Sequence, residues 1–268
     1  AGVVLVVAGS RSMTGAAALV ADGAGRAGAG LVNVAVPRSI LAVVESLFTP
    51  ATFLPLDETD GGTVAESAWA AIRERLQDVD ALAIGPGLTR DPSTVAFVER
   101  AVAESPVPVV IDADALNAFE GRAGELARRG SDAVLTPHAG ELARLTGVPA
   151  GEAAQDRVSA ARKAAAETGC TVLFKGSRTV IAEPEGRTVV NPTGGSYLAT
   201  GGTGDVLTGA IAAFIAAGAR PSDAAALGAY VHGLSGRLAF DELGPGVVAP
   251  DVAARLPAAL RSLQEESP

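Results

Sequence analysis

Short runs of Val, Ile, Leu and Ala recur along the chain and alternate with longer, Ala-rich segments that carry charges. Because the short runs are continuously apolar, they are typical of parallel strands that are covered on both faces. The last two runs, joined by a turn that contains Gly186, are predicted to form a hairpin at the sheet edge. The predicted strands are Val3–Ala8, Leu31–Val36, Ala81–Ile84, Val107–Ile111, Ala133–Leu135, Thr171–Phe174, Thr179–Ala182 and Thr188–Val190.

Helices are predicted between most of these strands, and from Gly204 onward the pattern is helical throughout. Strands that alternate with helices indicate an α/β fold with a mostly parallel sheet and helices on both faces. No repeat, low-complexity tract or linker interrupts the pattern, so we expect one domain over residues 1–268. The predicted helices before Gly204 are Ala16–Arg26, Val64–Leu76, Ser93–Glu104 and Ala150–Thr168.

Composition narrows the possible functions. Hydrophobic residues make up 48% of the 268 residues but aromatic residues only 4%, so the core must be aliphatic. The net charge of −9 argues against a nucleic-acid surface. The longest apolar stretch, 206–219, is too short to span a bilayer. The single cysteine, Cys170, indicates a reducing cytoplasm.

The segment "ATGGTGDVLTGAI", Ala199 to Ile211, combines a glycine-rich loop with the start of a predicted helix. Glycines let backbone N–H groups turn inward, and the first turn of a helix adds unpaired donors, so an anion fits there. The alternative is that the glycines only form a turn and cap the helix. Asp205 favours a catalytic phosphate site over a simple turn. A fixed carboxylate would repel a bound phosphate, and its presence there is explained if it acts as a general base on the attacking hydroxyl group. The helix dipole is expected to lower its pKa.

Three further segments place polar side chains after predicted strands. In "LTPHAGELARL", His138 and Glu141 are three residues apart and are interpreted either as site residues or as helix caps. In "VVIDADALN", Asp112 is interpreted as a functional residue that reaches a metal–phosphate site through a water molecule. Asp114 is interpreted as a helix N-cap. Lys175, one of two lysines, ends an apolar strand, and a nucleotide phosphate or ribose nearby would explain its position.

Other candidates carry less weight. The loop "GSRSMTG", Gly9–Gly15, lacks a phosphate-binding fingerprint and is interpreted as either a turn or a pocket wall. The segment "AIGPGL" is a predicted strand that ends in a glycine turn, and the backbone of this turn is expected at the carboxyl end of the sheet. His232, in an apolar helix, is interpreted as a satisfied core histidine.

These segments occur in an order that resembles the NAD(P)H-hydrate dehydratases of the ribokinase-like superfamily. The resemblance covers nearly the whole chain and is most specific in "TPHAGE" and in "GGTGDVLTG" after "NPTG". It implies a three-layer αβα sandwich, an oligomer that is commonly a tetramer, and a functional link to an NAD(P)H-hydrate epimerase. The matching segments are "GSRSMTGAA", "AIGPGL", "IDADALN", "LTPHAGELARLTG", "LFKGSRTVIAEPEG", "NPTGGSYLATGGTGDVLTG" and "AYVHGLSG".

The activity implied is repair of the S-form of hydrated NADH and NADPH. The ring hydroxyl of the hydrate is phosphorylated and phosphate then leaves, which restores the dihydronicotinamide. Bacterial members generally use ADP and eukaryotic ones ATP, with Mg²⁺; the Ala- and Arg-rich composition looks bacterial, so ADP is expected.

Matching positions carry the family's roles onto this chain. Asp205 matches the base and also a hydrate contact, and Ala16, Gly87 and His138 match other positions of the hydrate pocket. Asp112 and Glu141 are candidates for a water-mediated Mg²⁺ site. The nucleotide-binding positions implied by the resemblance are Lys175, Gly176, Ser177, Arg178, Thr179, Gly202, Thr203 and Gly204.

Two departures from the family pattern are visible. Many members read "GNPGM" where this chain has "GGSYL", Gly194–Leu198, beside the expected pocket. Members also usually carry a glycine-containing segment ahead of the first strand, which is not seen in this sequence, and the sequence leaves open whether such a segment or a fused epimerase domain belongs to the protein. Two other functions stay open: a ribokinase-like kinase of a vitamin or sugar alcohol, with the same base and loop, and a non-catalytic adenine-nucleotide sensor.

Overall fold

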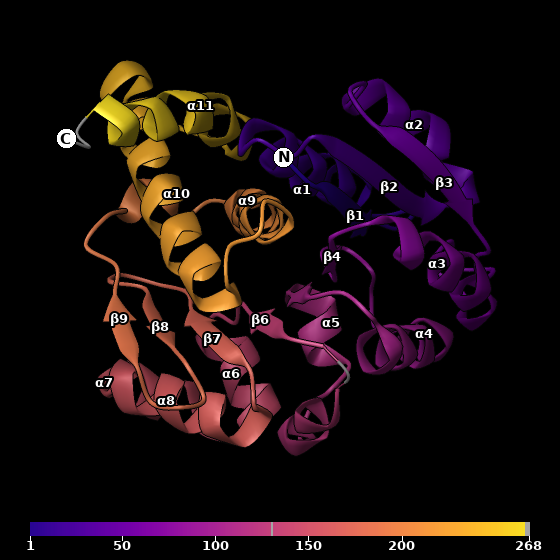
Figure 1. Cartoon of the computed structure of the whole chain (residues 1–268), viewed down its shortest axis with the longest axis horizontal. Coiled ribbons are helices and arrows are strands. Elements are labelled where there is room, and N and C mark those ends of the chain that lie inside the picture. Colours follow the sequence, from indigo (N-terminus) through magenta and orange to yellow (C-terminus); the bar gives the residue numbers. More distant parts are fainter. Residues whose placement is uncertain (130, 266–268) are drawn as a thin grey trace.

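A nine-stranded sheet forms the centre of the molecule in the computed structural model, which describes residues 1–129 and 131–265 (Figure 1). The strand order is β3-β2-β1-β4-β5-β6-β7-β8-β9, and all pairs from β3 to β7 are parallel. The strands are β1 (Val3–Val7), β2 (Leu31–Pro37), β3 (Thr52–Leu56), β4 (Ala81–Ile84), β5 (Val109–Ile111), β6 (Ala133–Leu135), β7 (Thr171–Phe174), β8 (Val180–Ala182) and β9 (Thr188–Val190).

Helices cover both faces of the sheet (Figure 1). One face carries α1 (Thr14–Arg26), α2 (Leu41–Leu47), α9 (Thr203–Ala216), α10 (Pro221–Leu243) and α11 (Ala249–Glu265). The other face carries α3 (Trp69–Arg75), α4 (Pro92–Glu104), α5 (Ala113–Asn117), α6 (Ala139–Thr146), α7 (Ala150–Gln155) and α8 (Arg157–Thr168). The predicted three-layer αβα sandwich is therefore confirmed.

Side chains that alternate along each strand supply the two cores. In β1, Val4 and Val6 pack under α1 and α9, whereas Leu5 and Val7 face the opposite helical layer. All four are fully buried. Both faces are covered, so both must be apolar, and this explains why the strand runs are continuously hydrophobic.

The predicted edge hairpin is confirmed, because β8 pairs antiparallel with both β7 and β9. Strand β3 at the opposite edge was not predicted. It contains Pro55 and is only partly buried, and proline is tolerated there because an edge strand leaves backbone N–H groups unpaired. Helix α2 was also missed, since it has only seven residues and buries only Val44.

Two predicted helices differ from the structure. The segment predicted over Val64–Leu76 is helical only as α3, between short 3₁₀ turns. The segment predicted over Ala150–Thr168 breaks at Asp156, whose carboxylate accepts a hydrogen bond from the Ser159 N–H and so caps α8. Within the described part of the chain, no helix has the length and hydrophobicity needed to cross a membrane.

Candidate active site

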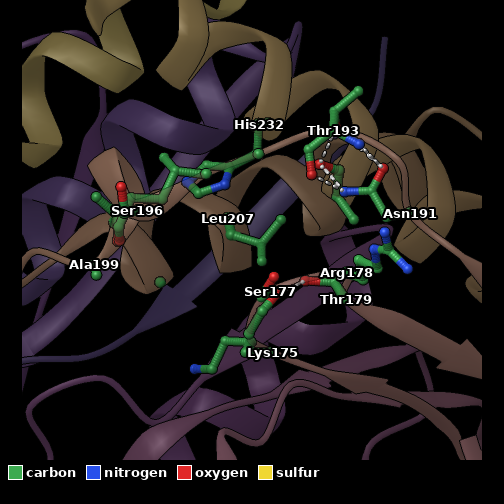
Figure 2. Close-up of a pocket in the computed structure, with 18 residues that line it drawn as sticks. Lys175, Ser177, Arg178, Thr179, Asn191, Thr193, Ser196, Ala199, Leu207 and His232 are labelled. Atoms are coloured by element: carbon green, nitrogen blue, oxygen red, sulfur yellow. Dashed lines mark hydrogen bonds between the residues drawn. The ribbon is translucent and has the colours of Figure 1, made fainter. Parts of the chain in front are cut away.

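A cavity of about 420 Å³ opens between the end of β7, the start of α9 and the middle of α10 (Figure 2). The loop that follows β9 forms a further wall. The cavity therefore lies at the carboxyl end of the parallel strands, where ligands of such sheets gather. It is lined by Lys175, Gly176, Ser177, Arg178, Thr179, Asn191, Thr193, Gly194, Gly195, Ser196, Leu198, Ala199, Thr203, Gly204, Leu207, Ala229, His232 and Gly233.

The start of α9 is shaped by its glycine loop. Gly202, the N-cap, has a φ of +87°, and a Cβ there would lie 2.5 Å from Leu19 Cδ1. The hydroxyl of Thr203 donates to the carbonyl oxygens of Leu198 and Thr200, which ties the loop to the first turn. Among the residues that the structure describes, no side chain caps α9, so its first N–H groups can meet an anion at the cavity.

A charged cluster lies beside this helix start. Lys175 Nζ is 2.7 Å from Asp112 Oδ1 and 3.8 Å from Glu141 Oε2. The other Asp112 oxygen accepts a hydrogen bond from Thr208 Oγ1 at 2.8 Å. A Cβ on Gly204 would lie 3.3 Å from Lys175 Nζ, so the ammonium group is held against the first turn of α9. The structure thus gives Lys175 anionic partners within the protein, whereas the sequence suggested a ligand.

Asp205, in the first turn of α9, has its pKa raised from 3.8 to about 7. Burial is the main cause, the negative charge of Asp112 adds to it, and the Lys175 ammonium opposes it. The expected lowering of this pKa by the helix dipole is wrong, because desolvation and like charges outweigh the dipole. A carboxyl group with a pKa near 7 is suited to accept a proton at neutral pH.

The neighbouring charges are shifted as well. Burial raises the pKa of Glu141, and the Lys175 ammonium opposes that change. Burial alone lowers the pKa of Lys175, but the charges of Asp112 and Glu141 more than compensate and raise it above its usual value. Lys175 is therefore protonated, and its positive charge interacts with the carboxylates of both Asp112 and Glu141.

The same contacts test the predicted Mg²⁺ site. The ammonium group of Lys175 lies between Asp112 and Glu141, and both Asp112 oxygens already accept hydrogen bonds. Within residues 1–129 and 131–265, no three His, Cys, Asp or Glu side chains gather as a metal site would require. These residues do not fit a site in which they bind a metal directly, and their water-mediated contact with Mg²⁺ stays a prediction.

His138 and Glu141 form a reciprocal cap at the start of α6. The His138 Nδ1 accepts from the N–H groups of Gly140 and Glu141, and Glu141 Oε2 accepts from the His138 N–H. The capping interpretation is therefore confirmed. Since Glu141 also reaches Lys175, the cap connects α6 to the charged cluster.

Asp114 does not have its expected position. It lies inside α5, and Asp112 occupies the N-cap position without making a side-chain cap. The Asp114 carboxylate instead accepts from the Thr89 N–H and from Asn117, so its role is structural as expected but its partners differ.

None of the expected hydrate contacts lines the described cavity; Asp205 directly follows Gly204, which does. Ala16 and Gly87 are neighbours, since a Cβ on Gly87 would meet the Ala16 Cβ at 3.0 Å, but neither they nor His138 line the described cavity. Gly202, the N-cap of α9, does not line the cavity, while the other expected nucleotide-binding residues line it. The assignment of all these residues to ligands stays a prediction.

Two residues of the site were not found from the sequence. Thr208 is three residues after Asp205, but only the fold shows that it donates to Asp112. His232 is buried, with 6% of its surface exposed, yet it lines the cavity and its Nε2 has no hydrogen-bond partner in the described chain (Figure 2). The expectation of a satisfied core histidine is wrong in that respect. Burial lowers its pKa to about 4, so it is neutral at pH 7.

Comparison with known proteins adds independent information. The family model described as NAD(P)H-hydrate dehydratase matches residues 4–258. The bifunctional NAD(P)H-hydrate repair enzyme Nnr of Moorella thermoacetica is 46% identical over 266 residues, which cover 99% of this chain and 50% of that protein. The ADP-dependent (S)-NAD(P)H-hydrate dehydratase of Bacillus subtilis is 36% identical over 243 residues, covering 90% of this chain and 82% of that enzyme. The chain spans about half the length of the bifunctional relatives.

Solved structures agree on the fold. A crystal structure of the ADP/ATP-dependent NAD(P)H-hydrate dehydratase from Bacillus subtilis, co-crystallised with ATP and Mg²⁺, has a TM-score of 0.82 at 32% identity. It covers 97% of this chain and 92% of the other. A hydroxyethylthiazole kinase from Pyrococcus horikoshii has a TM-score of 0.64 at 20% identity and shows only that the fold is shared. The chain therefore has a ribokinase-like fold and belongs to the NAD(P)H-hydrate dehydratase family.

Proposed function

We propose that this chain catalyses the ADP-dependent dehydration of the S-form of NADH-hydrate and NADPH-hydrate, which returns them to NADH and NADPH. Family membership supports the activity, and the Bacillus subtilis relative is named as an ADP-dependent enzyme of this kind. The observation that carries the proposal is the position of Asp205, one residue after the cavity-lining Gly204, with a pKa near 7.

In the proposed reaction, Asp205 accepts the proton of the hydrate's ring hydroxyl as that oxygen attacks the terminal phosphoryl group of the nucleotide. A new oxygen–phosphorus bond forms while the bond to the leaving nucleotide breaks. Phosphate then leaves with the electrons of its carbon–oxygen bond, helped by the lone pair of the ring nitrogen. Loss of a ring proton restores the double bond.

The cavity is proposed as the nucleotide site. Its cationic and hydroxyl-bearing wall, from Lys175 to Thr179, faces the free N–H groups at the start of α9. Both features attract phosphate. We propose Mg²⁺ as a companion of the nucleotide, because the Bacillus subtilis relative was co-crystallised with ATP and Mg²⁺.

We further propose a functional partner, an oligomeric state and a cellular location for this chain. Bifunctional relatives named as repair enzymes support a functional link to an NAD(P)H-hydrate epimerase. A homotetramer, a bacterial source, a cytoplasmic location and a single domain over residues 1–268 follow from the sequence arguments above and stay predictions.

The test is a direct assay. Purified protein is supplied with hydrated NADH or NADPH, Mg²⁺ and either ADP or ATP, and the return of dihydronicotinamide absorbance is followed together with released phosphate. We expect recovery of the cofactor with one phosphate released per turnover, and faster turnover with ADP than with ATP.

Other outcomes would identify other functions. A stable phosphorylated product, with no return of absorbance, would indicate a ribokinase-like kinase acting on a different alcohol. Nucleotide binding without turnover of any hydrate would indicate a sensor and overturn the proposed activity.

A further inference from the structure

Arg157, the first residue of α8, lies directly behind the Lys175–Thr179 wall of the cavity. Its Nη2 donates a hydrogen bond to the Phe174 carbonyl oxygen at 2.7 Å, and its guanidinium stacks over the Phe174 ring, 4.0 Å from the centroid. Phe174 is the last residue of β7, so Arg157 contacts the end of this strand, where the loop that lines the cavity begins.

The charge of Arg157 has no anionic partner among the described residues. No Asp or Glu oxygen within the described part of the chain lies in ion-pair range of its guanidinium, and its buried Nε has no hydrogen-bond partner there. Burial lowers the pKa of Arg157 and no carboxylate compensates. Because arginine stays protonated in proteins, a positive charge is left uncompensated beside the loop.

Gly176 connects this charge to the cavity. It lines the cavity, has a φ of +146°, and a Cβ there would lie 2.9 Å from Arg157 Nη1. The guanidinium therefore fills the space behind Gly176 that any larger side chain would need. The Gly176 backbone therefore lies between the Arg157 guanidinium and the cavity.

We propose that Arg157 is a positioning residue for the phosphates of the nucleotide, which supply the anionic partner that the described part of the chain does not provide. It acts through the Gly176 backbone without touching the ligand, and it favours ligands in proportion to their negative charge. This inference rests on the proposed nucleotide site.

The experiment compares adenosine, AMP and ADP as ligands of the whole chain, with dissociation constants from titration calorimetry and adenosine measured by displacement. The variants are Arg157→Gln, which removes the charge, and Arg157→Lys, which keeps it. Arg162→Gln is the matched control, because Arg162 is exposed on the same helix.

For Arg157→Gln we expect the affinity for ADP to fall about tenfold, the affinity for AMP to fall less, and adenosine to change by less than about twofold. Arg157→Lys keeps the positive charge and should bind ADP within about threefold of the wild type, and Arg162→Gln should match the wild type.

An equal loss for all three ligands would show a packing effect and overturn the inference, as would unchanged ADP affinity or the same loss in Arg162→Gln. If Arg157→Gln does not fold, Arg157→Lys decides, and a loss of more than about threefold there counts against the inference. If the wild type binds none of the three ligands, the proposed nucleotide site itself is wrong. Binding by the wild type with no effect of Arg157→Gln overturns only the present inference.

Discussion

Lys175 Nζ lies 2.7 Å from Asp112 Oδ1, although the two residues are 63 positions apart in the chain. Asp112 follows β5 and Lys175 follows β7, and β6 lies between these strands in the sheet. The Asp112 side chain of this pair is almost fully buried, with 1% of its surface exposed. It joins the two strand ends to the start of α9, where Asp205 lies.

The balance of charges around Lys175 explains why the pKa of Asp205 is raised. Three carboxyl groups, on Asp112, Glu141 and Asp205, share the field of one lysine ammonium group. Full ionisation would leave an excess of negative charge in a buried site, so one proton is retained near neutral pH.

Asp205→Asn should lower turnover by roughly 10²-fold or more, because a positioned base contributes about that much. The nucleotide should still bind, since the substitution leaves the glycine loop and Lys175 in place. Steady-state kinetics and calorimetry with ADP measure the two effects. The variant should be at least as stable as the wild type at pH 8, because it removes a buried charge. Wild-type turnover in this variant would show that Asp205 is not the base.

The pH dependence of kcat/KM should report the pKa of Asp205. The raised value of about 7 means that the ionised, proton-accepting form exists mainly above pH 7. The rate should therefore fall as the pH drops below about 7. The ionised form is the one disfavoured by folding, so stability should decrease as the pH rises from about 4 to 7. A flat rate profile between pH 5.5 and 8 would contradict this assignment.

Lys175→Met should destabilise the fold by about 3 kcal/mol, because it leaves Asp112 and Glu141 without their cation. The loss should be larger at pH 8 than at pH 5, since protonation of carboxylates relieves the repulsion at lower pH. Urea unfolding at both pH values measures this, with Lys163→Met on the exposed side of α8 as the control. We also expect ADP affinity to fall more than the chemical rate. Equal destabilisation at both pH values would contradict the electrostatic explanation.

Thr208→Val should cost about 1 to 3 kcal/mol of unfolding free energy, because the shape is kept but Asp112 Oδ2 loses its donor. Thr208→Ser retains the hydroxyl and should lose much less. Denaturant titration of both variants measures the difference. If the serine variant is destabilised as strongly as the valine variant, methyl packing and not the hydrogen bond is responsible.

Gly202→Ala should destabilise the start of α9 by about 1 to 3 kcal/mol, since the position has a φ of +87° and the new Cβ would overlap Leu19. Gly201→Ala, the neighbouring exposed position with no atom within 4 Å of a Cβ, is the matched control and should be nearly neutral. Thermal unfolding compares the two. Equal shifts in both variants would mean that the loop tolerates either residue.

Much of the fold could be predicted because the signals are local. The continuous apolar runs at β1 and β2 and the Ala-rich helices follow directly from burial on both faces of a sheet. Strand β3 escaped prediction because its proline is permitted only by its edge position, and edge position depends on the whole sheet.

The sequence alone determined the α/β class, the edge hairpin, the glycine loop before α9 and the place of Asp205 in the first turn of that helix, since each depends on neighbours along the chain. Only the tertiary structure decided that Lys175 pairs with Asp112, that Asp205 has a raised pKa, and that Arg157 lies behind Gly176 with no carboxylate partner among the described residues. The physical reason is that burial and charge depend on groups brought together from different strands and helices, and no local pattern records those distances.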